Sequence, residues 1–166
     1  IERAIENTNK IDGRMEIFKT RDEKIIVVDY AHTPDSYFKV LSTLKKLQNN
    51  QNKMHVLFGC GGNRDSKNRN QMGKIAADFS DKIWITPDNP RYENIEKINS
   101  EILEGIDKNK YNICNDRKNG LEKAIAKINR DDILVIFGKG RENYQDINGI
   151  KIKYSDIEII EKYLWG

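Results

Sequence analysis

Four short apolar runs, each followed at once by a loop of glycine, proline or charged residues, most strongly constrain the fold of this chain. The runs occupy residues 25–28, 54–58, 83–86 and 133–137, and helical patterns separate them. Continuous apolar runs of this length are typical of parallel strands that are buried on both faces. We therefore predict an α/β fold, a Rossmann-like, open and mostly parallel sheet of about six strands with helices on both faces.

Cap and turn signals predict the remaining elements. Thr33 and Pro34 begin a helix over 34–47, and Asp116 begins one that ends near 128. Further helices are expected over 72–79 and 95–106, and after the capping box that Ser155 forms with Glu158. Short strands are expected at 111–114 and, in antiparallel orientation after the Asn148-Gly149 turn, at 150–154.

The length of 166 residues suits one domain with a full hydrophobic core. Residues 1–18 have the pattern of an inter-domain connector or hinge, and residues 19–166 that of the globular domain. The first residues are typical of the tail of a helix, and we expect the chain to begin inside a longer protein.

Composition excludes several classes of function. The 29 Lys and Arg residues are interspersed with 26 Asp and Glu residues, which argues against nucleic acid and membrane partners and for a cytoplasmic location. Cys60 and Cys114 have no CxxC spacing, and no metal-ligand set, catalytic triad, Walker loop or G-x-G-x-x-G fingerprint is present. The chain thus lacks its own standard phosphate-binding loop.

The loops that follow the strands hold the candidate site residues. Because the carboxyl ends of parallel strands meet at one edge of the sheet, these loops should share a crevice. Their arginines, carboxylates and bare glycine backbone suit a zwitterionic or phosphorylated small molecule. Taken alone, the loops also fit structural roles: an Asx-type turn at 88–91, a surface ion pair for Arg64, and a turn organised by Asp29 and Thr33.

Five segments, in order and spacing, carry a resemblance to a known family. They are Gly-Arg-Met-Glu at 13–16, Asp-Tyr-Ala-His-Thr-Pro-Asp at 29–35, Phe-Gly-Cys-Gly-Gly-Asn-Arg-Asp at 58–65, Asp-Asn-Pro-Arg at 88–91 and Gly-Lys-Gly at 138–140. Together they resemble the C-terminal domain of the Mur ligases. Within that family they are most similar to the ligases that add meso-diaminopimelate to UDP-N-acetylmuramoyl-L-alanyl-D-glutamate.

The resemblance implies an ATP-dependent peptide ligase of bacterial cell-wall synthesis with three domains. The N-terminal domain would bind the UDP-sugar, and a central domain would hold most of the ATP and Mg²⁺. The third domain, represented here, would bring the amino acid to an acyl phosphate formed on the nucleotide peptide. The resemblance assigns no metal ligand and no catalytic residue to this domain. The domain alone should be inactive.

The resemblance also assigns residues to ligands. Arg14 would reach toward the ATP phosphates, Asp29 would hold the ribose, and His32 would lie beside it. The diaminopimelate site would consist of Arg64, Asp88, Asn89, Pro90, Arg91, Gly138 and Glu142. The two arginines would bind carboxylate, whereas Asp88, Asn89 and Glu142 would bind the distal ammonium.

Members that add lysine differ at the position of Arg91, which favours diaminopimelate here. Alternatives remain: a ligase for lanthionine or lysine, or a non-enzymatic module that binds a diamino acid. One departure from the family pattern is Arg141, which stands where the family usually has histidine, while Glu142 and Tyr144 are retained.

Overall fold

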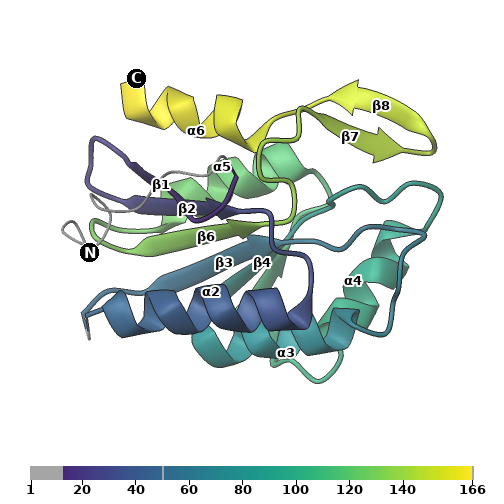
Figure 1. Ribbon diagram of the computed structural model, residues 1–166, viewed down its shortest axis with the longest axis horizontal. Coiled ribbons are helices and arrows are strands. Elements are labelled where there is room, and N and C mark those ends of the chain that lie inside the picture. The colour runs from purple at the N-terminus through teal and green to yellow at the C-terminus, as the bar shows by residue number, and fades with distance from the viewer. Residues whose placement is uncertain (1–12, 50, 166) are drawn as a thin grey trace.

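The computed structural model describes residues 13–49 and 51–165, and a six-stranded sheet forms its centre. The sheet has the order β1-β2-β6-β3-β4-β5 (Figure 1). Its strands are β1 Glu16–Lys19, β2 Ile25–Asp29, β3 Met54–Phe58, β4 Lys82–Ile85, β5 Tyr111–Ile113 and β6 Ile133–Phe137. All neighbours are parallel except β1, which pairs antiparallel with β2 at one edge. The predicted open, mostly parallel architecture is confirmed.

Helices cover both faces of this sheet, as predicted. Figure 1 shows α2 Pro34–Leu47, α3 Arg69–Phe79 and α4 Ile95–Leu103 on one side, and α5 Arg117–Lys127 with α6 Asp156–Trp165 on the other. Alternate strand residues supply the two cores: Val27 packs in the core with α2, α3 and α4, whereas Ile26 and Val28 pack in the core with α5 and α6. Burial on both faces explains the continuous apolar runs.

Two helices begin where their caps predict. The side chain of Thr33 accepts the Ser36 N–H in a capping box with Pro34 in the first turn of α2, and Asp116 caps α5 by accepting the Asn119 N–H. The prediction placed the start of α3 at residue 72, three residues late. Its first turn is polar in sequence but contains the buried Arg69. Helix α4 ends at Leu103, earlier than predicted, before Gly105 with a φ of +79°.

The predicted final strand forms, but outside the main sheet. Ile150–Lys153 (β8) pairs antiparallel with Tyr144–Ile147 (β7) in a separate hairpin, and the polar sequence of β7 gave no strand signal. The sixth strand of the sheet is β1. It begins at Glu16, inside the stretch predicted as connector, while residues 1–12 of that stretch lie outside the described residues.

A three-residue 3₁₀ turn, Lys108–Lys110, precedes β5. No helix within residues 13–49 and 51–165 combines the length and apolar character needed to span a membrane.

Candidate functional site

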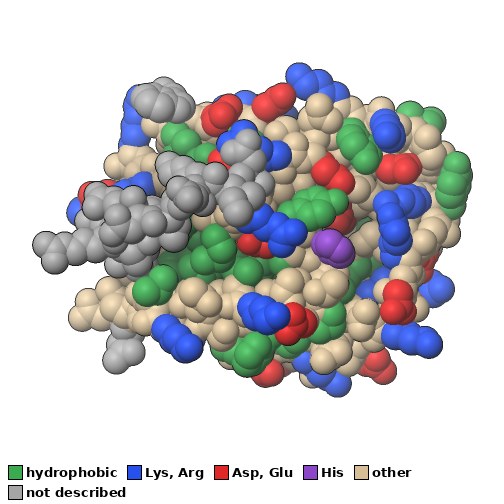
Figure 2. Space-filling view, in the orientation of Figure 1, with side chains coloured by type: hydrophobic (Ala, Val, Ile, Leu, Met, Phe, Trp, Pro, Cys, Tyr) green, Lys and Arg blue, Asp and Glu red, His purple; other side chains and the backbone are tan. Residues whose placement is uncertain are grey.

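A cavity of about 580 Å³ opens at the carboxyl ends of β2, β3, β4 and β6. Figure 2 shows acidic, basic and histidine side chains gathered around a hollow on this side of the molecule. The predicted site residues that line the cavity are His32, Arg64, Asp88, Asn89, Arg91, Gly138 and Glu142. The predicted residues Arg14, Asp29 and Pro90 do not line it.

Glycines allow the loops after β3 and β4 to pack backbone against backbone. A Cβ atom on Gly59 would lie 1.9 Å from the carbonyl oxygen of Thr86, and one on Gly62 would lie 1.9 Å from that of Pro90. Any side chain at either position would therefore separate the two loops. The Gly62 N–H also donates to the Asn89 carbonyl at 2.9 Å. Pro90 thus packs against the loop after β3.

Lys139 is the centre of the polar network beneath the cavity. Its side chain is fully buried, and Nζ donates to Glu142 Oε2 at 2.9 Å, Asn89 Oδ1 at 2.9 Å and Asp88 Oδ1 at 3.3 Å. Asn89 Nδ2 also donates to Glu142 Oε2 at 3.0 Å. A buried ammonium requires such partners, so Lys139 fixes three of the predicted site residues relative to one another.

The charges of this network do not cancel. The carboxyl groups of Asp88 and Glu142 share the single ammonium of Lys139 within ion-pair distance, and Arg117, the other cation that acts on Asp88, already pairs with Asp156. Burial raises the pKa of Asp88, partly opposed by Arg117 and Lys139. For Glu142, burial acts upward but the hydrogen bonds from Lys139 and Asn89 outweigh it and lower the pKa. The network therefore favours a second cation from a ligand.

Arg91 is fixed beside Gly62. It has a left-handed backbone with a φ of +51°, and Nη1 donates to the Gly62 carbonyl at 2.7 Å. Its Nε lies 3.9 Å from Asp146 Oδ2. Arg64 is exposed at the mouth of the cavity, and Gly61 lies between the two arginines: a Cβ there would be 3.1 Å from Arg91 Nη1 and 3.6 Å from Arg64 Cγ. Both arginines therefore flank one side of the cavity.

The β7–β8 hairpin holds the Asp-Asn-Pro-Arg loop in place. Gln145 Nε2 donates to the carbonyls of Pro87 and Asp88 at 3.1 and 2.9 Å, and the Asp146 N–H donates to Asn89 Oδ1 at 2.9 Å. The Arg91 N–H donates to the Asp146 carbonyl at 2.9 Å. Folding of the hairpin and positioning of the loop are thus coupled.

Two buried arginines support the loops from below. Arg69 donates to Glu93, Glu101 and the Gly61 carbonyl, which joins α3 and α4 to the loop after β3. Arg117 makes a bidentate pair with Asp156 and donates to the Phe137 carbonyl, which joins α5 and α6 to the end of β6. The Arg117 guanidinium also donates to Thr86 Oγ1 at 3.2 Å, so all three of its nitrogens have partners, whereas the buried Nε of Arg69 has none among the described residues.

Asp29 and His32, two of the three residues predicted to contact ATP, lie at the end of β2 and in the turn after it, and Arg14 lies in the segment before β1. Both carboxylate oxygens of Asp29 accept backbone N–H groups, from Met15 at 2.8 Å and Ala31 at 2.7 Å, and the side chain is buried. In the structure described, Asp29 therefore organises the turn. Arg14 and His32 are exposed, and His32 lines the cavity.

Sequence reasoning missed three contributors: Lys139, Gln145 and Asp146. Lys139 lies inside the Gly-Lys-Gly segment, and its flanking glycines were a signal of a tightly packed turn. Gln145 and Asp146 gave no signal, because a short polar strand is indistinguishable from a loop by periodicity. Within residues 13–49 and 51–165, no group of three His, Cys, Asp or Glu side chains is arranged to hold a metal ion.

Comparison with known proteins identifies the family. The family model "Mur ligase, glutamate ligase domain" matches residues 13–140. Proteins named UDP-N-acetylmuramoyl-L-alanyl-D-glutamate–2,6-diaminopimelate ligase from Rickettsia typhi and Aquifex aeolicus are 42% and 43% identical, over 98% and 100% of this chain. The chain spans about a third of the length of each, 32% and 34% respectively.

Solved structures agree with this assignment. A structure of a UDP-N-acetylmuramoyl-L-alanyl-D-glutamate–2,6-diaminopimelate ligase superposes on 95% of this chain with a TM-score of 0.84 and 37% identity, and the match covers 32% of that protein. A bifunctional folylpolyglutamate and dihydrofolate synthase from Yersinia pestis, with a TM-score of 0.60 and 15% identity, shares the fold. The chain belongs to the Mur ligase family and carries its glutamate ligase domain.

Proposed function

We propose that this domain binds the incoming amino acid in an ATP-dependent ligase that adds meso-diaminopimelate to UDP-N-acetylmuramoyl-L-alanyl-D-glutamate in the bacterial cytoplasm. The observation that carries the proposal is the division of charge in the cavity. Arg64 and Arg91 flank one side of it, and Asp88 and Glu142 belong to the network beneath it. The relatives named for this reaction match the domain along nearly its whole length.

The division of charge matches the chemistry of diaminopimelate. Each end of that molecule carries an ammonium and a carboxylate, so its distal end offers both charges to the protein. The planar guanidinium groups of Arg64 and Arg91 suit the carboxylate. The excess negative charge of Asp88 and Glu142 over Lys139 suits the ammonium. Lysine lacks the distal carboxylate, so the guanidinium groups that bind it would have no anionic partner at that end of the ligand.

Catalysis by such a domain is a matter of alignment. The amine of the bound amino acid attacks the carbonyl carbon of the acyl phosphate, phosphate leaves, and an amide bond forms. Holding the amine at that carbon replaces a bimolecular encounter with a nearly intramolecular one. The fixed network of Lys139, Asn89 and Glu142 supports this role because it leaves little freedom in the residues that would orient the ligand.

ATP and Mg²⁺ are assigned mainly to parts of the ligase outside this domain. The described residues contain neither a metal-ligand group nor a Walker loop. Arg14 and His32 are both exposed, and His32 lines the cavity, so domain closure would bring them to the nucleotide. Ribose binding by Asp29 would require its turn to open, because both its oxygens already accept N–H groups.

The test is ATP-dependent phosphate release by the full-length ligase that carries this domain. UDP-N-acetylmuramoyl-L-alanyl-D-glutamate is supplied with meso-diaminopimelate, meso-lanthionine or L-lysine in turn. Release with diaminopimelate and not with lysine supports the proposal. Release with lanthionine as well would mean that the site recognises the charged groups at the two ends of the amino acid and not the atoms between them. Release with lysine alone contradicts it, and release with none of them points to a non-enzymatic binding module.

A further inference from the structure

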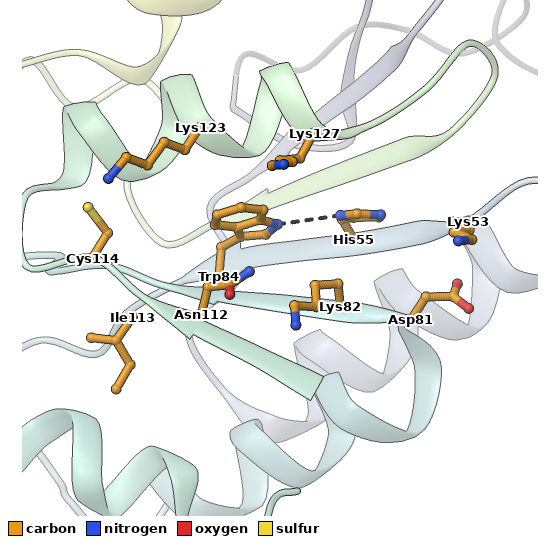
Figure 3. A pocket seen from close by; sticks show the side chains of 10 residues that line it. All are labelled: Lys53, His55, Asp81, Lys82, Trp84, Asn112, Ile113, Cys114, Lys123 and Lys127. Atoms are coloured by element: carbon orange, nitrogen blue, oxygen red, sulfur yellow. Dashed lines mark hydrogen bonds between the residues drawn. The ribbon is translucent and has the colours of Figure 1, made fainter. Parts of the chain in front are cut away.

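A second hollow, of about 670 Å³, lies on the face of the sheet that α5 covers. It shares no lining residue with the cavity at the carboxyl ends of the strands. We call it the lysine groove and define it by Lys53, Lys82, Trp84, Asn112, Lys123 and Lys127. Figure 3 shows Trp84 at its centre, with Lys123 and Lys127 projecting from α5 on one side and Lys82 on the other.

The floor of the groove is fixed and uncharged. The indole Nε1 of Trp84 donates to His55 Nδ1 at 3.4 Å, and both side chains are buried (Figure 3). Accepting at Nδ1 places the single imidazole proton of His55 on Nε2. Burial also lowers the pKa of His55. The positive charge of the groove therefore comes from the lysines.

These lysines lack acidic partners. Among the described residues, Lys53, Lys123 and Lys127 form no ion pair, and Lys82 Nζ donates to the carbonyl of Asn109 at 2.8 Å. Asp81 is the one acidic residue lining the groove, and its Oδ2 accepts the Met54 N–H at 2.9 Å. Four lysine side chains thus line one hollow in a chain whose net charge is only +3. Such a local excess attracts anions.

We propose that the lysine groove is a binding site for a small polyphosphate anion. Lysine ammonium groups are compact point charges suited to phosphate oxygens, whereas bidentate recognition of a carboxylate favours arginine, and no arginine lines the groove. The side-chain amide of Asn112, which also lines the groove, can donate to the same oxygens. This site is independent of the proposed ligase function.

A thiol at the groove makes the proposal testable. Cys114 lines the groove and is partly exposed, whereas burial raises the pKa of Cys60, the other cysteine, to about 12. Uncharged iodoacetamide should therefore alkylate Cys114 selectively, because the thiolate is the reactive form. The rate is followed by mass spectrometry with and without sodium tripolyphosphate at constant ionic strength. We expect tripolyphosphate to slow alkylation several-fold and saturably.

Matched variants locate the effect. The double variant Lys123→Gln/Lys127→Gln should weaken the protection of Cys114 by roughly tenfold in apparent affinity, a few-fold for each lost contact. Lys45→Gln/Lys46→Gln, which neutralises two exposed lysines at the end of α2, should leave the protection unchanged. An alkylation rate that tripolyphosphate does not alter, equal slowing by potassium chloride, or equal loss of protection in both double variants would overturn the proposal.

Discussion

At the scale of single residues, Lys139 determines how the charged groups beneath the cavity are arranged. Its ammonium is the only partner shared by Asp88, Asn89 and Glu142 in the described network. The sequence placed Asp88, Asn89 and Glu142 at one sheet edge because each follows a strand. It could not show that a buried lysine joins them, because burial of a charge depends on tertiary contacts.

Lys139→Met should destabilise the domain by about 3–5 kcal/mol, because it leaves two carboxylates beneath the cavity without their cation. Urea unfolding monitored by circular dichroism measures the loss. Lys153→Met, at a side chain 79% exposed, is the matched control and should change stability by less than about 0.5 kcal/mol. Equal stability of the two variants would show that the network does not depend on Lys139.

Gly62→Ala should push the loop after β3 away from the carbonyl of Pro90, at a cost of about 1–3 kcal/mol from overpacking. The expected kinetic result is a higher KM for the amino acid in the full-length ligase, since Arg91 is bonded to the Gly62 carbonyl. Gly61→Ala is the milder comparison, because its new methyl meets a side-chain atom at 3.1 Å. A smaller effect for Gly62→Ala than for Gly61→Ala would contradict the packing argument.

At the scale of elements, the four apolar runs and two helix caps were predicted correctly because burial and capping are encoded locally. Strand β8 was also predicted, from the turn signal before it, but its partner β7 was not. Strand β7 is polar, and its position depends on contacts between Gln145, Asp146 and the loop at 88–91. The start of α3 was missed for a similar reason. Arg69 appears in sequence as a surface residue, but tertiary partners bury it.

Protonation of Glu93 should weaken the contacts that Arg69 makes between α3, α4 and the loop after β3. Its hydrogen bonds with Arg69 lower its pKa to about 2. A carboxylate whose pKa is lower in the folded state stabilises the fold above its ordinary pKa of 4.5 and loses that contribution as pH falls toward 2. The free energy of unfolding of the wild type should therefore fall over this window.

Chemical denaturation at a series of pH values tests this dependence. Glu93→Gln should lower stability at pH 7 and show a shallower decline between pH 4.5 and 2, because the titrating group is gone. Glu158→Gln, at a side chain 57% exposed, should keep the wild-type slope. A Glu93→Gln profile parallel to that of the wild type would show that the pair with Arg69 does not control acid stability.

At the scale of the whole molecule, the fold positions one charged cavity at the carboxyl ends of its parallel strands, as doubly wound sheets generally do. That location was predictable from the loops that follow the apolar runs, and the family followed from five segments in sequence. The hydrogen bonds of Asp29 in its turn and the buried arginines that support the loops could not be predicted from the sequence. They depend on which partners the folded chain brings together. The chain spans about a third of the length of the relatives that it matches.

The most direct test of the account compares kcat/KM for meso-diaminopimelate and L-lysine in the full-length ligase and its Arg91→Ala variant. Leaving a desolvated carboxylate unpaired costs about 2–5 kcal/mol, so the variant should lose about 30-fold to several thousandfold with diaminopimelate and little with lysine. Arg130→Ala, at an exposed side chain that does not line the cavity, should leave kcat/KM unchanged for both amino acids. An equal loss with both amino acids would contradict the role of Arg91 in recognising the distal carboxylate.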